Sequence, residues 1–100
     1  MGVTISKDNG SAIALLEGDI DHHTAKNIRE TIDAYAENER PSMLKLDFSG
    51  IQFMDSSGIG LIMGRYRLMK LLGGELKIIN LPQHIEKVIK LAGLSVLGLL

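Results

Sequence analysis

The chain has 100 residues, of which 45% are hydrophobic, and this is enough to form one core and a single domain over 1–100. Its net charge of −1, from 11 basic and 12 acidic residues, argues against nucleic acid or an anionic membrane as the partner. Without cysteine there are no disulfides or thiolate sites, and the longest apolar stretch, 91–100, is about half the length needed to span a bilayer. We therefore expect a cytoplasmic protein.

Two short strands are expected at the start of the chain. Apolar residues alternate with their neighbours in 3–5 and again in 13–15. Asn9 and Gly10, between them, form a dipeptide typical of a tight hairpin turn because both residues tolerate positive φ. The two strands should therefore pair in an antiparallel hairpin.

After Ile20 the apolar residues change to helical spacing. Asp21 or Thr24 is available as the N-cap, and the predicted helix ends before Pro41. Its apolar positions are Ala25, Ile28, Ile32, Tyr35 and Ala36. The next segment, Met43–Phe48, alternates as a short strand does.

A second helix is predicted over residues 56–72, ending at Gly73. Its apolar positions are Ile59, Ile62, Met63, Tyr66 and Met69. A strand over 75–80 follows, and a third helix begins at Pro82 and is capped by Gly93. The last seven residues fit either a strand or the start of a helix.

This order of elements predicts an α/β fold. Alternating strands and helices require right-handed crossovers and a sheet that is parallel apart from its opening hairpin. We expect a mixed four- to five-stranded sheet with an N-terminal antiparallel hairpin, flanked by helices. If the second and third strands are neighbours, the turns at Asp21 and Asp55 lie on the same edge of the sheet, where sites on such sheets form.

The segment FMDSSGIGLIMG, residues 53–64, places two serines at the head of the second helix and three glycines within it. Glycine in a helix interior costs about 1 kcal/mol relative to alanine, so the glycines need a reason. Their spacing fits neither a phosphate-binding P-loop nor a dinucleotide fingerprint, and no G-x-S-x-G elbow indicates a serine nucleophile. Two interpretations of the serines remain: they only cap the helix, or one is exposed as a substrate for phosphorylation.

The residues around the serines are also expected to have distinct roles. Gly58 and Gly60 should let another protein approach the backbone closely, whereas Gly64 is assigned to tight packing against the sheet. Arg65 is expected on a solvated helix face, and Met54 either in the core or exposed beside the serines as part of a binding surface. A phosphate at a helix head suits the free N–H groups there, but its charge would be buried in a complex. We therefore expect phosphorylation to weaken binding without changing the fold.

The segment GDIDHHTA, residues 18–25, raises the alternative of a metal site, because the D-H-H triplet resembles that of manganese phosphoesterases. Those enzymes take further ligands from a much longer chain, and only His84 remains here as another histidine. Adjacent residues of an extended segment point to opposite sides, so His22 and His23 do not converge easily on one ion. We expect no metal here and interpret the segment as a helix-capping turn.

GDIDHHTA followed by LDFSGIQFMDSSGIG resembles the STAS domain, in particular the anti-sigma factor antagonists of spore-forming bacteria. The resemblance implies a mixed sheet flanked by helices, no enzymatic activity and no cofactor. It also implies a role in regulating transcription during sporulation. The unphosphorylated form would bind an anti-sigma factor that is also a serine kinase, releasing the sigma factor. The kinase would phosphorylate the first serine of the D-S-S-G motif, and a serine phosphatase would reverse the step.

Carried to this chain, the resemblance makes Ser56 the phosphoacceptor of a protein that is monomeric when free. The partner-binding residues would be Asp21, Met54, Asp55, Ser56, Ser57, Gly58 and Ile59. Family members usually continue into a final strand and an amphipathic helix, so we expect a shortened C-terminal element. A STAS module of another partner-switching pathway, such as stress signalling or biofilm control, is the alternative within the family, and a manganese phosphoesterase is the alternative outside it.

Overall fold

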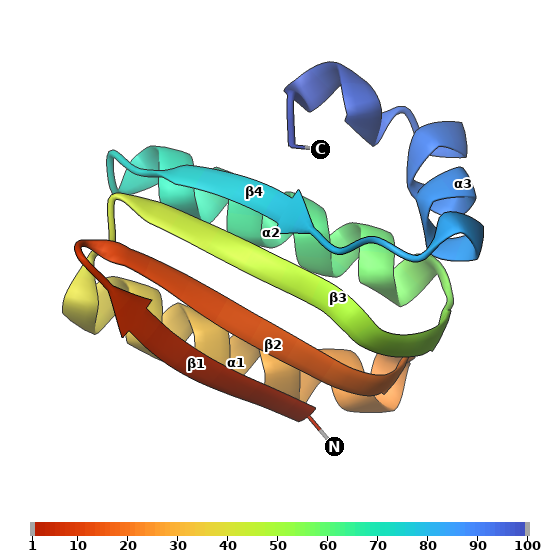
Figure 1. Ribbon diagram of the computed structural model, residues 1–100, viewed down its shortest axis with the longest axis horizontal. Helices are drawn as coiled ribbons and strands as arrows, with labels where there is room; N and C mark the ends of the chain where they lie inside the picture. Colours follow the sequence, from red (N-terminus) through yellow and green to blue (C-terminus); the bar gives the residue numbers. More distant parts are fainter. Residues whose placement is uncertain (1, 100) are drawn as a thin grey trace.

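The computed structural model describes residues 2–99, apart from the side chains of residues 95 and 96, as one sheet with helices packed against it (Figure 1). The elements in chain order are β1 (Gly2–Asp8), β2 (Ser11–Ile20), α1 (His22–Glu39), β3 (Met43–Met54), α2 (Ser56–Leu71), β4 (Glu75–Ile79), α3 (Gln83–Leu91) and a 3₁₀ turn, η1 (Leu94–Leu97). The order of elements agrees with the sequence prediction. The final segment, left open between strand and helix, contains η1, and its last residue lies outside the described part.

The sheet has the order β1-β2-β3-β4, so consecutive strands are neighbours. β1 and β2 pair antiparallel, whereas β2 with β3 and β3 with β4 are parallel. The hairpin turn places Asn9 at φ 49° and Gly10 at φ 83°, the left-handed region that this dipeptide tolerates. The predicted mixed sheet of four strands with an N-terminal hairpin is confirmed.

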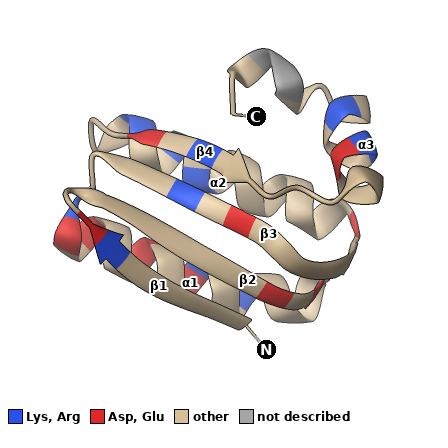
Figure 2. Ribbon diagram, viewed as in Figure 1, with Lys and Arg blue, Asp and Glu red and all other residues tan. Residues whose placement is uncertain are grey.

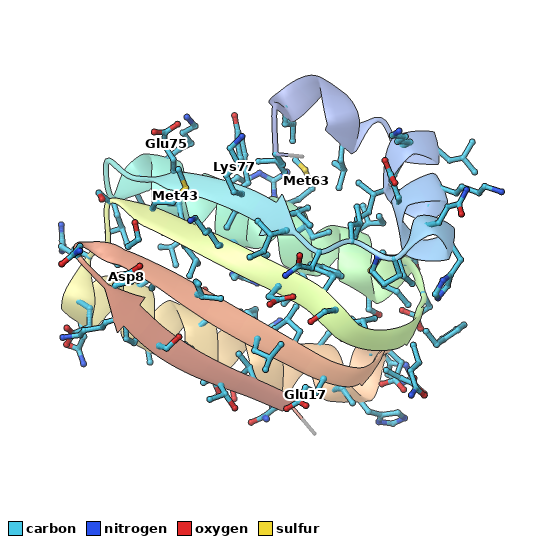
Figure 3. The ribbon with its side chains drawn as sticks, in the orientation of Figure 1. Asp8, Glu17, Met43, Met63, Glu75 and Lys77 are labelled. Atoms are coloured by element: carbon cyan, nitrogen blue, oxygen red, sulfur yellow. The ribbon has the colours of Figure 1, made fainter. Side chains whose placement is uncertain are left out.

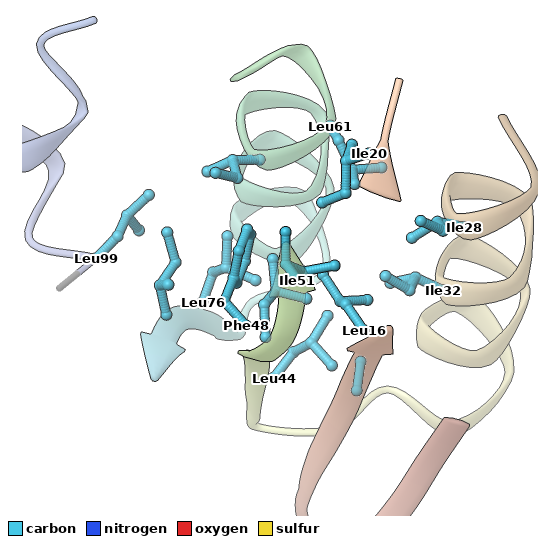
Figure 4. Close-up of a cluster of buried hydrophobic side chains, with 14 of the residues drawn as sticks. Leu16, Ile20, Ile28, Ile32, Leu44, Phe48, Ile51, Leu61, Leu76 and Leu99 are labelled. Carbon is cyan, nitrogen blue, oxygen red and sulfur yellow. The ribbon is translucent and has the colours of Figure 1, made fainter. Parts of the chain in front are cut away.

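Both long helices lie on the same face of the sheet, behind it in the view of Figure 1. The strands alternate, so Ala12, Ala14 and Leu16 of β2 are buried on this face, and the helices bury apolar side chains against them. Figure 4 shows side chains of the strands and of both helices meeting in one cluster. This packing fixes where the two helices begin at the edge of the sheet.

The opposite face of the sheet carries mostly polar side chains. Figure 3 shows Glu17, Glu75 and Lys77 standing out from it, and Figure 2 shows acidic and basic residues following one another along β3 and β4. α3 and η1 lie beyond the β4 edge in Figure 1, where the Ile78 N–H donates to the Leu99 carbonyl at 2.7 Å. The C-terminal segment thus extends the core past the last strand.

β3 is longer than predicted, because its strand continues from Phe48 to Met54. The pairing with β2 shifts register twice, first before Glu17, which lies opposite Gly50, and again after Gly18, so that Ile20 lies opposite Met54. A Cβ at Gly50 would lie 2.8 Å from the Leu16 carbonyl oxygen, so the first shift requires a glycine. The polar Ser-Gly pair that accommodates this irregularity also hid the strand from the alternation pattern.

Candidate functional site

Two turns lie side by side where β2 and β3 end. These parallel neighbours finish together, with Ile20 opposite Met54, and the Asp55 N–H donates to the Ile20 carbonyl at 3.0 Å. Asp21 follows the first strand and Asp55 the second. The expectation that the two turns share one edge of the sheet is therefore confirmed.

Asp21 is the N-cap of α1. Its Oδ1 accepts hydrogen bonds from the backbone N–H groups of His23 at 2.9 Å and Thr24 at 3.0 Å, while the Asp21 N–H donates to Thr24 Oγ1 at 3.0 Å. This reciprocal arrangement is a capping box. The backbone hydrogen bond from Thr24 is the main cause that lowers the pKa of Asp21, so the first turn holds a carboxylate that stays charged.

Asp55 is the N-cap of α2 through a simpler arrangement, in which its Oδ1 accepts the Ser57 N–H at 2.7 Å. Ser56 is the first residue of the helix and is exposed. Its hydroxyl makes no hydrogen bond to any group in the described part of the chain. Since Asp55 supplies the cap, the Ser56 side chain is left available at the surface.

The residues beneath the two serines are packed rather than open. Met54 is only 6% exposed, and a Cβ on buried Gly58 would lie 2.2 Å from both Cγ and Sδ of Met54. Of the two alternatives for Met54, the core position is confirmed and the exposed one is wrong, and Gly58 is required by packing rather than by access to the backbone. Ile59 is half-buried, so of the expected binding residues only the polar ones and the edge of Ile59 reach the surface.

The other two helix glycines have the opposite environment. Apart from the backbone of α2 itself and the adjoining residues, no atom in the described part of the chain lies within 4 Å of a Cβ built on Gly60 or on Gly64. The assignment of Gly64 to tight packing against the sheet is thus wrong. Both glycines face open space beside α1, in contrast to Gly58 two residues earlier in the same helix.

Arg65 is a residue that sequence reasoning misplaced. It is 5% exposed rather than solvated, and its Nε lies 2.7 Å from Asp33 Oδ1 in an ion pair whose N–H is too poorly aligned for a hydrogen bond. Its other nitrogens donate to Asp33 Oδ2 at 3.3 Å and to the Leu61 carbonyl at 3.2 Å. Burial raises the pKa of Asp33 more than the neighbouring guanidinium lowers it, so the pair links α1 to α2 with little net gain. The sequence does contain a signal for this position: Arg65 follows the apolar Leu61 by four residues, which places both on the same face of the helix.

The histidines do not form a metal site in the described part. His22 and His23 begin α1 instead of lying in an extended segment, and their ring centroids are 4.0 Å apart. His84, on α3, bonds to the Gln52 carbonyl with 2.9 Å between the atoms. Within residues 2–99 no group of three or more His, Asp or Glu side chains is placed to hold one ion.

Two further findings define the surface around the turns. Phe53, next to the Met54–Asp55 turn, is 53% exposed, so a large apolar side chain lies at the surface beside the serines. None of the helices between residues 2 and 99 has both the length and the apolar character needed to cross a membrane.

Comparison with known proteins connects this geometry to a family. Residues 3–97 match the family described as "STAS domain". The chain is 32% identical over 92 residues to the anti-sigma F factor antagonist of Paenibacillus polymyxa, covering 92% of this chain and 79% of that protein. It is 27% identical over 95 residues to the anti-sigma-B factor antagonist of Bacillus subtilis (strain 168), covering 95% and 85%.

Solved structures agree with these matches. The unphosphorylated form of the anti-sigma factor antagonist SpoIIAA superposes with a TM-score of 0.82 at 28% identity, over 93% of this chain and 82% of that one. The phosphorylated form of SpoIIAA from Bacillus superposes with a TM-score of 0.75 at 27% identity, over 94% and 86%.

Proposed function

The chain belongs to the STAS domain family, and we propose that it is an anti-sigma factor antagonist switched off by phosphorylation of Ser56. In this proposal the unphosphorylated chain, a monomer in the cytoplasm, binds an anti-sigma factor that is also a serine kinase and so releases a sigma factor. The kinase modifies Ser56, and a serine phosphatase restores the active form. The chain itself is a binding protein rather than an enzyme.

One observation carries the proposal: Ser56 offers an exposed hydroxyl, unpaired within the described residues, at the first position of α2, while the Asp55 side chain supplies the cap. A serine that only capped the helix would use its own oxygen for the backbone N–H groups. The similarity to SpoIIAA, which is known in phosphorylated and unphosphorylated forms, supports the same assignment.

The charges around Ser56 indicate how a phosphate would act. The helix N-terminus favours an anion, so the folded chain should accept the group. The phosphate adds about −1.5 to −2 charges beside the carboxylate of Asp55 and near that of Asp21. A hundredfold loss of affinity requires about 2.7 kcal/mol, and burying an unpaired charge at an interface costs that much or more. A single modification is therefore sufficient to release the partner.

The test is phosphorylation by the cognate anti-sigma factor kinase with ATP, followed by mass spectrometry of the product. We expect one phosphate on Ser56, none on Ser56→Ala, and a phosphate still on Ser56 in the matched control Ser57→Ala. Ser56→Ala should bind the kinase and Ser56→Asp should bind it more weakly. Phosphate on Ser57, or no phosphate on the wild-type chain, would overturn the proposed mechanism.

A second pathway is favoured by a specific match. Similarity to the anti-sigma-B factor antagonist of Bacillus subtilis over 95% of this chain supports the same switch acting on a different sigma factor. Binding assays against an anti-sigma F and an anti-sigma-B factor separate the two, since the true partner should bind at least about tenfold more tightly.

A further inference from the structure

A groove of about 420 Å³ runs between α1 and α2, beginning at the serine turn. We call it the α1–α2 groove, and the residues that define it are His22, Lys26, Arg29, Ser57, Gly60 and Gly64. Ser57, next to Ser56, lies at its serine end. The groove is therefore continuous with the surface that the proposed function assigns to the partner.

The groove is basic. Lys26 and Arg29 are exposed on its α1 side, and neither forms an ion pair with any residue in the described part of the chain. The guanidinium of Arg65 also borders the groove, where Asp33 neutralises it. No Asp or Glu is among the described residues that line the groove, so its net charge is positive and complements an acidic ligand.

The fold does not require the groove to be open. Alanine stabilises a helix interior more than glycine does, yet α2 has glycine at two positions facing the groove, Gly60 and Gly64. Nothing lies within 4 Å of where their Cβ atoms would stand, so packing does not explain them. Gly58, which packing does explain, shows the contrast within the same helix. Gly60 and Gly64 weaken the helix and leave the basic groove open, which indicates that another molecule binds there.

We propose that the α1–α2 groove binds an acidic segment of the partner protein, contributed by the anti-sigma factor that docks on the serine turn. This inference rests on the proposed function and specifies how the partner is recognised. The volume suits several side chains, and Lys26 with Arg29 would pair with Asp or Glu. A phosphate on Ser56 would stand at the mouth of the groove and repel that acidic segment, so the groove adds to the effect of the switch.

The test measures the affinity of the cognate anti-sigma factor for the unphosphorylated chain by calorimetry at several salt concentrations. Lys26→Glu/Arg29→Glu should bind about tenfold or more weakly and lose part of the salt dependence. The matched control Lys45→Glu/Lys77→Glu makes the same charge change at paired positions of β3 and β4. Lys77 stands on the sheet face away from α1 and α2 (Figure 3), so this variant should bind within about twofold of wild type.

A second variant tests the groove without changing its charge. Gly64→Leu places a good helix former in the groove and should also weaken binding about tenfold, while circular dichroism shows an unchanged fold. Wild-type affinity in either groove variant would overturn the inference. If the wild-type chain itself fails to bind any anti-sigma factor, the proposed function fails instead, so the two failures are distinguishable.

Discussion

The glycines of α2 offer a sharp test of the packing, because alanine should have opposite effects at two of them. Gly64→Ala adds a methyl group where no atom lies within 4 Å and removes a residue that weakens helices. We expect the free energy of unfolding to rise by about 0.5 to 1 kcal/mol. For a domain of this size that corresponds to a rise in Tm of roughly 2 to 8 °C.

Gly58→Ala should behave differently. Its Cβ would lie 2.2 Å from Cγ and Sδ of Met54 and 3.1 Å from Cε, so the buried methionine must move from near its base as well as its tip. Overpacking costs typically about 1 to 3 kcal/mol, against which the gain in helix propensity is about 1 kcal/mol. The net result should be a loss of up to about 2 kcal/mol.

Urea denaturation of the two single variants measures both effects, and a double-mutant cycle with Met54→Ala isolates the contact. Truncating Met54 removes the clash, so Gly58→Ala in the Met54→Ala background should stabilise about as much as Gly64→Ala does. Equal stabilisation by Gly58→Ala and Gly64→Ala in the otherwise wild-type chain would refute the reasoning, as would destabilisation by Gly64→Ala.

Three further predictions concern the surroundings of the site. Arg65→Met should lower the free energy of unfolding, measured by urea denaturation, by about 1 to 3 kcal/mol because it leaves Asp33 unpaired. Adding Asp33→Leu to this variant should restore most of the lost stability, and a double variant whose effects simply add would contradict the reasoning. The pKa of Asp21 is lowered on folding, so its stabilisation is present above the unfolded pKa of about 3.9 and is lost as pH falls through the folded pKa. Thermal melts of Asp21→Asn from about pH 5 to pH 2 should therefore show a shallower acid limb than wild type, and an identical limb would count against the cap. Phe53→Ala should weaken binding of the anti-sigma factor about tenfold. Leu71→Ala, 82% exposed but roughly 22 Å from Ser56 along α2, should not weaken it, and equal effects would remove Phe53 from the interface.

The sequence predicted the fold well because local signals and long-range pairing agreed. The Asn9-Gly10 turn determined the hairpin, and helical spacing between strands required parallel crossovers, which brought the turns at Asp21 and Asp55 together. What failed depended on contacts between distant residues. β3 continues past Gly50 although its pairing with β2 shifts register there, and residue 50 is glycine because the Leu16 carbonyl on β2 leaves no room for a side chain; no alternation pattern records this contact.

The candidate site shows the same division. Ser56 at the head of a helix follows from the order of residues, since Asp-Ser-Ser before an apolar stripe is a local signal. The open surroundings expected at Gly60 are confirmed, but the roles expected of Gly58 and Gly64 were wrong, because only the position of Met54 distinguishes these two glycines. Arg65 was placed with the exposed basic residues because its partner, Asp33, lies 32 positions away on α1. Such pairings need the packed helices rather than the pattern along either one.

The construction of the serine turn separates stability from recognition. Asp55 begins α2 by accepting the Ser57 N–H, so the helix does not need the Ser56 hydroxyl. Beneath this turn, the buried side chain of Met54 packs against Gly58. Ser56 itself is exposed, so a charge added there is not buried in the core. Such a charge remains at the surface, where the helix N-terminus stabilises it. On the proposed function, its unfavourable effect falls only on a partner that must bury it, and a phosphatase acting on the folded chain can therefore reverse the switch.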